Sequence, residues 1–375
     1  MFVEKVVISG TGLYTPDQKI SNEELVEAYN QYVDDFNQTN SVEIESGSLE
    51  PLQRSSAEFI NKASGINSRY VMNRSGILNP DRMCPEIPER PDSEMSLQCE
   101  MAVAAAKQAL TNANRKPQDI DAVIVGCSNM QRAYPAISIE VQQALGIEGF
   151  AFDMNVACSS ATFGIQMAVD TVRNNNARAV LVISPEITTG HLNFTDRDSH
   201  FIFGDVATAV VVESSNSCSV ENYFEIIETK LFTEFSNNIR NNFGFMNRTD
   251  ESKSGNSDKL FRQNGRKVFK EVCPAVVKQI CEQLDRNSVP VEQIKRLWLH
   301  QANINMNQLI SRKVLGRDPQ PEEAPIVLDE YANTSSAGSI IAFHLYRDDL
   351  VAGDTGVICS FGAGYSIGSI LVRCG

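Results

Sequence analysis

The sequence lacks the features that mark several large classes of protein. No apolar run approaches the roughly 20 residues that a membrane-spanning helix needs. The first residues lead straight into an apolar strand at positions 6–9, so no signal peptide is expected. Basic residues are in deficit, with 33 Lys and Arg against 47 Asp and Glu and a net charge of −14. A field of that sign does not attract phosphate, which argues against a nucleic-acid partner.

Cysteine and histidine show no pattern of a disulfide framework or a metal site. The nine cysteines, an odd number without framework spacing, predict reduced thiols and a cytoplasmic protein. Only four histidines occur, and no metal-ligand spacing is present, so no metal is expected. Gly10-Thr11-Gly12 follows a strand, but the third glycine of a dinucleotide-binding loop is missing. The 42% hydrophobic and 21% charged content of the 375 residues is that of an ordinary globular protein.

Apolar strands alternate with amphipathic segments along the chain, which predicts an α/β fold with helices on the faces of a sheet. The second half resembles the first, because aligning Ile294 with Ile120 places Asn303 on Asn129. Such a pairing predicts two similar α/β halves that meet at a shared face. A proline at 274 is expected to kink or delay one helix of the second half. Polar stretches, read as decoration, entrance lids or a mobile loop, lie at 31–58, 73–92 and 233–259.

Cys158 stands where a buried strand becomes a helix. An apolar run at 149–154 precedes it, and from Ala161 onward apolar residues recur at helical spacing. Unpaired backbone N–H groups and the helix dipole favour a thiolate at such a position, which makes the thiol a plausible nucleophile. The alternative is that this cysteine only fills space in the core, as free cysteines usually do.

Three further loops of small residues follow apolar segments. His300 ends a strand at such a loop, whereas His191 and His344 are read as core or surface histidines. Asn333 opens the last apolar helix, where it could also serve as a simple N-cap. The glycine loop at 361–364 is either a hairpin or a set of backbone N–H groups that receives an oxyanion. If the two halves face each other, these loops converge on the first half's thiol.

Cys158, His300, Asn333 and the glycine loop, in that order, resemble the thiolase superfamily and, more narrowly, β-ketoacyl-acyl-carrier-protein synthase III. The resemblance covers nearly the whole chain. It implies a thiolase-like fold of two duplicated α/β halves in an αβαβα arrangement. Residues 1–215 would form the half with the nucleophile, and residues 216–375 the half with the other three motifs. Four separated motifs in the right order are specific, where any single one would be weak.

The resemblance also implies a reaction, a decarboxylating condensation of an acyl-CoA with malonyl-acyl-carrier protein in fatty-acid biosynthesis. Cys158 would take the acyl group as a thioester. His300 and Asn333 would donate hydrogen bonds to the malonyl thioester oxygen as enolate charge develops. The backbone N–H groups of Cys158 and Gly364 would hold the tetrahedral oxyanion. No cofactor is expected beyond the two thioester substrates.

Binding residues are implied more weakly, because some positions depart from the family pattern. Phe59 stands where the family has a tryptophan that stacks on CoA. Ala63 stands where the family has an arginine that helps to hold CoA. The residues expected to contact acyl-CoA are Phe59, Tyr134, Arg197, Asn303 and Phe361. Tyr134 matches a residue that the partner subunit places at the end of the acyl pocket, which implies a homodimer. Asn305 replaces the family's carrier-docking arginine, and the remaining candidate patch for the acidic carrier is Arg266, Lys267 and Lys270.

Three alternatives stay open. A thiolase-fold acyltransferase would pass the acyl group to an alcohol or amine without condensation. A 3-hydroxy-3-methylglutaryl-CoA synthase looks similar but needs a catalytic glutamate that the sequence does not locate. A non-enzymatic partner of the same fold would lack the nucleophile. Ser159 and Ser160, in place of small apolar residues, together with the polar insertions suggest a primer longer than acetyl, of medium length.

Overall fold

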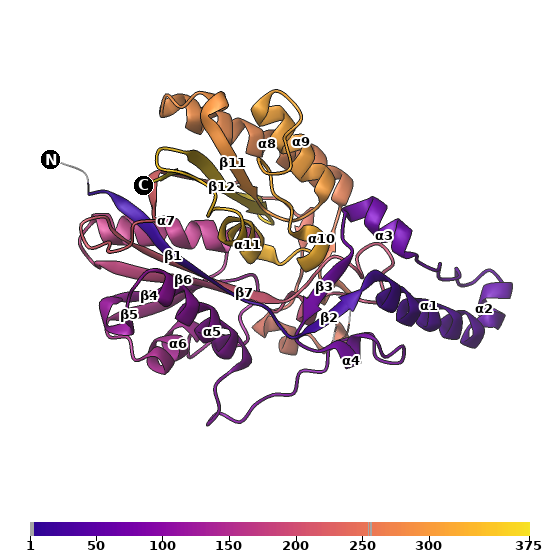
Figure 1. Ribbon diagram of the computed structural model, residues 1–375. Coiled ribbons are helices and arrows are strands. Elements are labelled where there is room, and N and C mark those ends of the chain that lie inside the picture. Colours follow the sequence, from indigo (N-terminus) through magenta and orange to yellow (C-terminus); the bar gives the residue numbers. More distant parts are fainter. Residues whose placement is uncertain (1–3, 254, 256) are drawn as a thin grey trace.

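A mixed nine-stranded sheet runs through the computed structural model, which describes residues 4–253, 255 and 257–375 (Figure 1). Its strand order is β11-β12-β13-β8-β1-β7-β6-β4-β5. Two small ribbons, β2 with β3 and β9 with β10, lie outside this sheet. The strands are β1 (Val6–Tyr14), β2 (Gln18–Ser21), β3 (Ser68–Val71), β4 (Ala122–Gly126), β5 (Phe150–Met154), β6 (Ala179–Glu186), β7 (Val206–Ser214), β8 (Phe224–Thr233), β9 (Ile239–Arg240), β10 (Arg262–Gln263), β11 (Ile294–Leu299), β12 (Thr355–Gly362) and β13 (Ser366–Cys374).

The sheet consists of two halves with the same pairing pattern, as the internal resemblance predicts. In the first half β4 pairs in parallel with β6, which pairs antiparallel with β7. In the second, β11 pairs in parallel with β12, which pairs antiparallel with β13. Within the sheet, β1 and β8 join the halves through two residue pairs, Val7 with Glu225 and Ile8 with Phe224. The division at residue 215 falls in the connection between β7 and β8 and stays a prediction.

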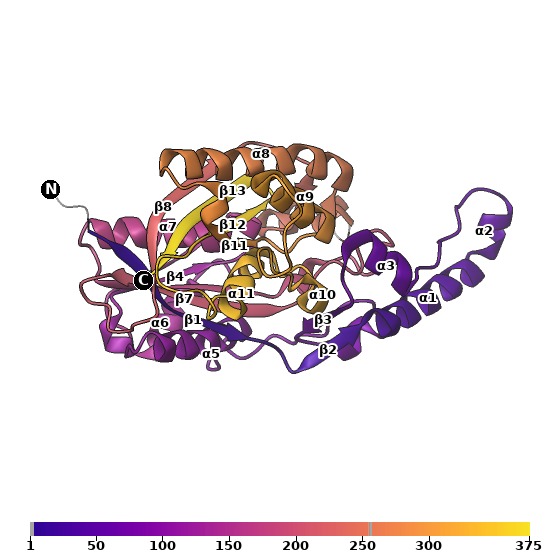
Figure 2. The same cartoon turned by 45° about the horizontal axis from the view of Figure 1, so that its top comes forward.

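Helices form three layers around the two half-sheets, so the predicted αβαβα arrangement is confirmed (Figure 2). Helices α7 and α11 lie between the half-sheets, α5 and α6 cover the first half, and α8 and α9 cover the second. The helices are α1 (Asn22–Thr39), α2 (Ser41–Glu45), α3 (Ala57–Ser64), α4 (Arg74–Ile77), α5 (Leu97–Asn112), α6 (Ile137–Leu145), α7 (Ser160–Arg173), α8 (Gly265–Arg286), α9 (Ile304–Leu315), α10 (Leu328–Tyr331) and α11 (Gly338–Leu345). Among the described residues, none of these helices has the length and apolarity to span a membrane.

Small residues let the central helix α7 approach the sheet closely. Gly164 faces β6, and a Cβ added there would lie 2.8 Å from Cγ1 of Val182. Ala161 and Ala168, on the same helix, are also buried in the central core. Burying a large apolar side chain is worth about 1.5–3 kcal/mol, so α7 and α11, packed from both sides, contribute strongly to stability. The loops that enter these two helices are therefore held on a rigid frame.

Two peripheral segments are more regular than their sequences suggest. The polar stretch from residue 31 is helical through Thr39, because the capping box of Ser21 and Glu24 starts a helix that continues through it. This helix, α2 and α3 form an arm that projects from the body (Figure 1). Pro274 does not delay its helix, since α8 begins well before it, at Gly265. Neither segment offered an apolar period strong enough to place its ends.

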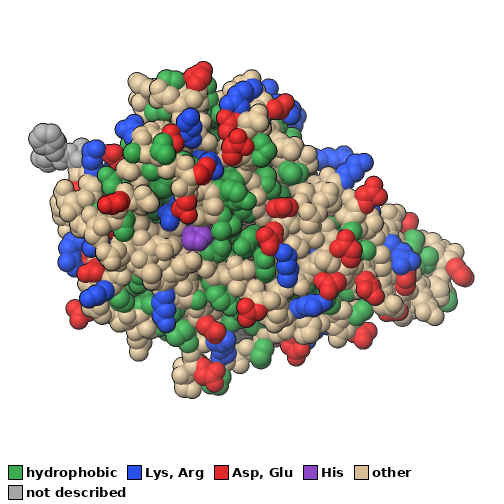
Figure 3. Space-filling model, viewed as in Figure 1, with side chains coloured by type: hydrophobic (Ala, Val, Ile, Leu, Met, Phe, Trp, Pro, Cys, Tyr) green, Lys and Arg blue, Asp and Glu red, His purple; other side chains and the backbone are tan. Residues whose placement is uncertain are grey.

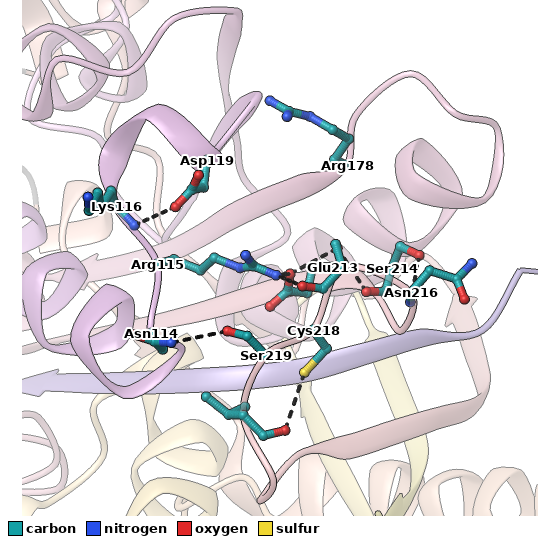
Figure 4. Close-up of polar contacts among 12 residues, drawn as sticks. Asn114, Arg115, Lys116, Asp119, Arg178, Glu213, Ser214, Asn216, Cys218 and Ser219 are labelled. Carbon is teal, nitrogen blue, oxygen red and sulfur yellow. Dashed lines mark hydrogen bonds and ion pairs between the residues drawn. The ribbon is translucent and has the colours of Figure 1, made fainter.

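A polar cluster closes the end of the sheet far from the arm (Figure 4). Glu213, at the end of β7, is completely buried and accepts hydrogen bonds from Arg115 at 3.0 and 2.5 Å. Ser217 donates to the same carboxylate at 3.1 Å, and Asn114 reaches Ser219 at 3.3 Å. These contacts fasten the segment after α5 to the turn after β7.

Candidate active site

Cys158, His300 and Asn333 lie in the wall of one cavity of about 530 Å³ between the two halves. Cys158 comes from the turn between β5 and α7, His300 follows β11, and Asn333 precedes α11. The structure therefore brings together residues separated by up to 175 positions of sequence, as the order of motifs predicts. The remaining wall is mainly apolar; its aromatic members are Phe59, Phe201, Phe203, Phe261, Phe269 and Phe361.

The turns that carry Cys158 and Asn333 enter the two central helices in the same way. Each begins with a non-glycine residue in the left-handed region, Ala157 at φ 46° and Ser335 at φ 50°. Each then makes one 3₁₀ turn before its α-helix, Ala157–Ser159 before α7 and Ser335–Ala337 before α11. The second residue of each turn is therefore Cys158 in one half and Ser336 in the other. The two halves therefore share the geometry of this turn, and the turn before α7 is the one that carries a cysteine.

Cys158 is a thiol at neutral pH, in contrast to the thiolate predicted from its place at a helix start. Burial raises its pKa to about 11, and the charge of Glu186 adds to that rise. Three donors oppose the rise: the Oγ of Ser335, at 3.5 Å from Sγ, the backbone N–H of Ala363 and the backbone N–H of Cys158 itself. Desolvation of the charged form outweighs the helix dipole here because the sulfur faces an enclosed cavity wall.

His300 is buried and neutral. Its backbone N–H donates to the carbonyl of Cys359 at 2.8 Å, which fixes the end of β11 against β12. Its ring meets Phe361 edge-on, with centroids 5.2 Å apart. Burial lowers the pKa of His300 to about 4, and a contact with the backbone of Ser335 opposes this only in part. At pH 7 the imidazole can therefore donate one hydrogen bond without carrying charge.

Asn333 is oriented by its own loop. Its backbone N–H donates to Ile202 at 2.9 Å, and its carbonyl accepts from Gly204 at 3.3 Å. Its Oδ1 accepts the backbone N–H of Ser335 at 2.9 Å. An oxygen must face that donor, so the Nδ2 group is the end of the amide left to donate elsewhere. The alternative role of a mere N-cap does not explain why the residue lines the cavity.

The glycine loop approaches the nucleophile closely. A Cβ added to Gly362 would lie 2.6 Å from Cβ and 2.9 Å from Sγ of Cys158, so only glycine fits. The prediction that Gly364 supplies the second oxyanion donor needs a correction by one residue. The backbone N–H beside the sulfur belongs to Ala363, whereas Gly364 does not line the cavity and its carbonyl accepts from Ser236 at 2.5 Å.

The residues expected to contact acyl-CoA are divided between two places. Phe59 and Arg197 meet, with the guanidinium 4.2 Å from the ring centroid, and Phe59 lines the cavity. Asn303 also lines it, caps α9, and donates to the carbonyl of Ala63 at 2.7 Å. Tyr134 lies elsewhere, 85% exposed and outside this chain's own cavity.

The candidate carrier patch lies at the start of α8. Arg266, Lys267 and Lys270 are all exposed, and Arg266 also lines the cavity. None of the three forms an ion pair within the described part of the chain. The positive end of the helix dipole adds to their field. The patch thus adjoins the cavity that contains Cys158.

Sequence reasoning missed several contributors. Ser335 and Ala363 stand inside motifs that were recognised, but only the fold shows that they contact the sulfur. Glu186 carried no pattern at all. Ser159 and Ser160 are fully buried and satisfy the turn, since Ser159 donates to Ser366 and Ser160 to Ala157. Neither lines the cavity, so their suggested link to the acyl chain stays a prediction.

Comparison with known proteins points to one family. The family model described as 3-Oxoacyl-[acyl-carrier-protein (ACP)] synthase III matches residues 152–234, and the model of its C-terminal part matches residues 284–374. The beta-ketodecanoyl-[acyl-carrier-protein] synthase of Pseudomonas aeruginosa is 60% identical over 93% of this chain and 99% of its own length. The beta-ketoacyl-[acyl-carrier-protein] synthase III of Ehrlichia canis is 29% identical over 99% of this chain and all of its own.

Solved structures agree in fold. The 3-oxoacyl-[acyl-carrier-protein] synthase III of Aquifex aeolicus superposes with a TM-score of 0.75 at 25% identity, over 98% of this chain and 99% of its own. The priming beta-ketosynthase of the R1128 polyketide pathway has a TM-score of 0.76 at 24% identity, over all of this chain and 98% of its own. The second likeness concerns the fold alone.

Proposed function

The chain belongs to the β-ketoacyl-acyl-carrier-protein synthase III family, and from this premise we propose which residues carry out its condensation of an acyl-CoA with malonyl-acyl-carrier protein. The observation that carries the proposal is the convergence of Cys158, His300 and Asn333 in one apolar cavity. A nucleophile and two neutral hydrogen-bond donors in one cavity meet the needs of a condensation that passes through an enolate.

Acylation of Cys158 comes first. Its sulfur attacks the acyl-CoA carbonyl, the backbone N–H groups of Cys158 and Ala363 stabilise the oxyanion, and the CoA thiolate leaves with the proton that the thiol gives up. Because burial raises the pKa of the Cys158 thiol to about 11, the thiolate that attacks is a minor species at neutral pH. Ser335, at 3.5 Å from the sulfur, is placed to stabilise the developing thiolate.

Condensation follows in the same cavity. Malonyl on the carrier loses carbon dioxide, and His300 and Asn333 donate to its thioester oxygen as the enolate forms. The enolate carbon attacks the carbonyl of the acyl group on Cys158. The sulfur of Cys158 leaves as a thiolate and takes up one proton from solvent. Neutral donors suit this step, because they stabilise charge that appears only in the transition state.

The primer is of medium length in this proposal. The 60% identical relative is named for a β-ketodecanoyl product, and a condensation that adds two carbons makes that product from an eight-carbon primer. The apolar wall supports the same choice, since its aromatic side chains offer a long acyl chain a dry surface. Phe59 and Arg197 would stack the adenine of CoA, and Arg266, Lys267 and Lys270 would meet the acidic carrier.

A second copy of the chain would complete the acyl pocket. Strand β5 is the last strand at one edge of the sheet, and its Phe150 and Phe152 are 43% and 37% exposed. Ile139 and Tyr134, nearby in sequence, are 47% and 85% exposed. An exposed apolar edge strand needs a cover, and a symmetric dimer provides one. We place this dimer in the cytoplasm, where its nine free cysteines stay reduced.

The alternatives are less well supported. A 3-hydroxy-3-methylglutaryl-CoA synthase needs a glutamate in the cavity, but among the described lining residues the carboxylate is Asp198, whose side chain is 86% exposed. Transfer to an alcohol or amine would not require Asn333. The family relationship likewise favours condensation.

One experiment tests the proposal. The purified protein is mixed with radiolabelled acyl-CoAs of two to twelve carbons, and then with malonyl-acyl-carrier protein. We expect label on Cys158, release of carbon dioxide only when the carrier is added, and the highest turnover with octanoyl-CoA. Absence of label would refute the acyl-enzyme, label without carbon dioxide would indicate simple transfer, and a preference for acetyl-CoA would overturn the primer assignment.

A further inference from the structure

Glu186 is a buried carboxylate directly behind the active site, and neither the family motifs nor the proposed chemistry uses it. It is the last residue of β6, is 1% exposed, and does not line the cavity. No arginine, lysine or histidine contacts it within the part of the chain that the structure describes. A carboxylate buried without a cation needs other compensation, because its desolvation costs several kcal/mol or more.

Hydrogen bonds from two different loops supply that compensation. Ser128, after β4, donates its backbone N–H to Oε1 at 3.0 Å and its hydroxyl to Oε2 at 2.6 Å. Ser336, in the turn before α11, donates its backbone N–H to Oε1 at 3.1 Å and also its hydroxyl. The Ser128 N–H also lies 3.2 Å from Oε2. All five contacts come from donors, so both oxygens act as acceptors and the side chain bridges the two halves.

The two residues that bind Glu186 are each connected to a residue of the proposed reaction. On one side, Ser336 directly follows Ser335, whose N–H orients the Asn333 amide at 2.9 Å. On the other, the carbonyl of Ser128 accepts from Asn155 at 2.7 Å, and Asn155 accepts the N–H of the residue before Cys158 at 2.9 Å. The backbone of Asn333 is itself hydrogen-bonded to Ile202 and Gly204 of the first half. The following turn, at Ser336, is tied to the first half by the side chain of Glu186.

We propose that Glu186 is a positioning residue for the condensation step, one that holds the turn of Asn333 and Ser335 in register with the half that carries Cys158. This inference rests on the proposed function. The nucleophile turn has anchors of its own, since Val156 donates to Ser160 at 2.9 Å and Ser159 donates to Ser366. Glu186 therefore acts mainly on the step that needs Asn333, and less on acylation of Cys158.

Two substitutions distinguish the effect of the length of the Glu186 side chain from the effect of its charge. Glu186→Asp keeps the charge but shortens the side chain by one methylene, so it cannot span both loops. Glu186→Gln keeps the length, and its amide oxygen can occupy the Oε1 position, which accepts a backbone N–H from each loop. The Ser128 N–H, which lies 3.0 Å from Oε1 and 3.2 Å from Oε2, then donates to that oxygen alone. Its NH₂ group then faces the hydroxyl of Ser128, which can accept. Glu213→Asp is the matched control, a buried glutamate at the opposite end of the same strand pair.

The experiment measures acylation by octanoyl-CoA in a single turnover, and carbon dioxide release by the acylated enzyme with malonyl-acyl-carrier protein. For Glu186→Asp we expect condensation to fall about 10- to 100-fold, as for a misplacement of about 1 Å, with KM for the carrier within twofold and acylation within threefold. Glu186→Gln should stay within threefold of the unaltered enzyme in both steps. Glu213→Asp should lower the thermal midpoint without separating the two steps.

The outcomes are distinguishable. If the unaltered enzyme shows no acyl-Cys158 or no carbon dioxide release, the proposed function fails. If it shows both, the inference is overturned by any of three results: full condensation activity in Glu186→Asp, equal losses in both of its steps, or a Glu186→Gln enzyme as impaired as Glu186→Asp. Selective loss in Glu186→Asp with rescue by Glu186→Gln supports it.

Discussion

Strands β6 and β7 pair antiparallel, and each buries a glutamate at its end, so that Glu186 and Glu213 lie at opposite ends of one strand pair. At the far end, Glu213 pairs with a cation, Arg115, within a cluster of local contacts (Figure 4). At the cavity end, Glu186 has no cation and depends on hydroxyl and N–H donors from two halves. The far end stabilises the fold, whereas the cavity end keeps separate loops in register.

The outer surface and the cavity wall differ in their side chains as well. Acidic and basic side chains are scattered over the face in Figure 3, with no single-sign field across it. The aromatic residues that would meet substrate lie instead inside the cavity. Substitutions at the cavity end should therefore change activity without loss of stability, and those at the far end the reverse. The predictions below test that division from the largest expected change in activity to the smallest.

Loss of the nucleophile should have the largest effect. Cys158→Ala removes the sulfur that forms the thioester, so acyl transfer should fall more than about 10³-fold. The measurement is radiolabel retained on the protein after incubation with octanoyl-CoA. The far-end control, Cys218→Ser, should label normally. Normal labelling of Cys158→Ala would show that another residue is acylated.

Gly362→Ala should reduce acylation about 100-fold, because the new methyl would lie 2.6 Å from Cβ of Cys158 and displace it. The thermal midpoint should change little, since the displaced atoms border a cavity. Gly244→Ala, with open space around its added Cβ, is the control and should match the unaltered enzyme. An active Gly362→Ala enzyme would contradict the close approach.

The pH dependence of Cys158 alkylation should show its raised pKa. Thiolate reacts and thiol does not, and at every pH below a pKa of about 11 the thiolate fraction grows about tenfold per unit. Iodoacetamide should therefore modify Cys158 about 100-fold faster at pH 9 than at pH 7. His300, with a pKa of about 4, stays neutral across this range and adds no inflection. A plateau below pH 9 would contradict this account.

Arg197→Ala should raise KM for acyl-CoA about tenfold and leave kcat nearly unchanged. The guanidinium lies 4.2 Å from the Phe59 ring, and a cation–π contact of this kind is worth roughly 1 kcal/mol or more. Steady-state kinetics with octanoyl-CoA measure the change. An octanoyl thioester of a short thiol, which has no adenine, serves as the control substrate, and its KM should not move. An equal rise for both substrates would count against an adenine contact.

Arg115→Met should leave activity unchanged and cost about 3 kcal/mol of unfolding free energy, because it strands the buried Glu213 without its cation. Urea unfolding measures the loss. Arg178→Met breaks the ion pair with Asp121, in which the arginine side chain is 69% exposed, and should cost less than about 1 kcal/mol. A loss of kcat in Arg115→Met would remove the distinction between the two ends.

The sequence predicted three site residues and their order, because four separated motifs resemble those of the synthase III family. Cys158, His300 and Asn333 all reach one cavity. The predictions that failed depended on position within a turn or on burial. The N–H group of Ala363, not that of Gly364, faces the sulfur. Residue types alone do not indicate which backbone N–H group of a glycine-rich loop faces the sulfur.

Sequence by itself predicted the α/β alternation and the duplication, which follow from periodicity. It also predicted the role of Cys158, which follows from the resemblance of four ordered motifs to the synthase III family. Only the tertiary structure decided the protonation states of Cys158 and His300, because burial outweighs local dipoles and burial is a property of the packed halves. It also decided the role of Glu186, whose partners Ser128 and Ser336 are 208 residues apart and meet only when the two half-sheets enclose α7 and α11.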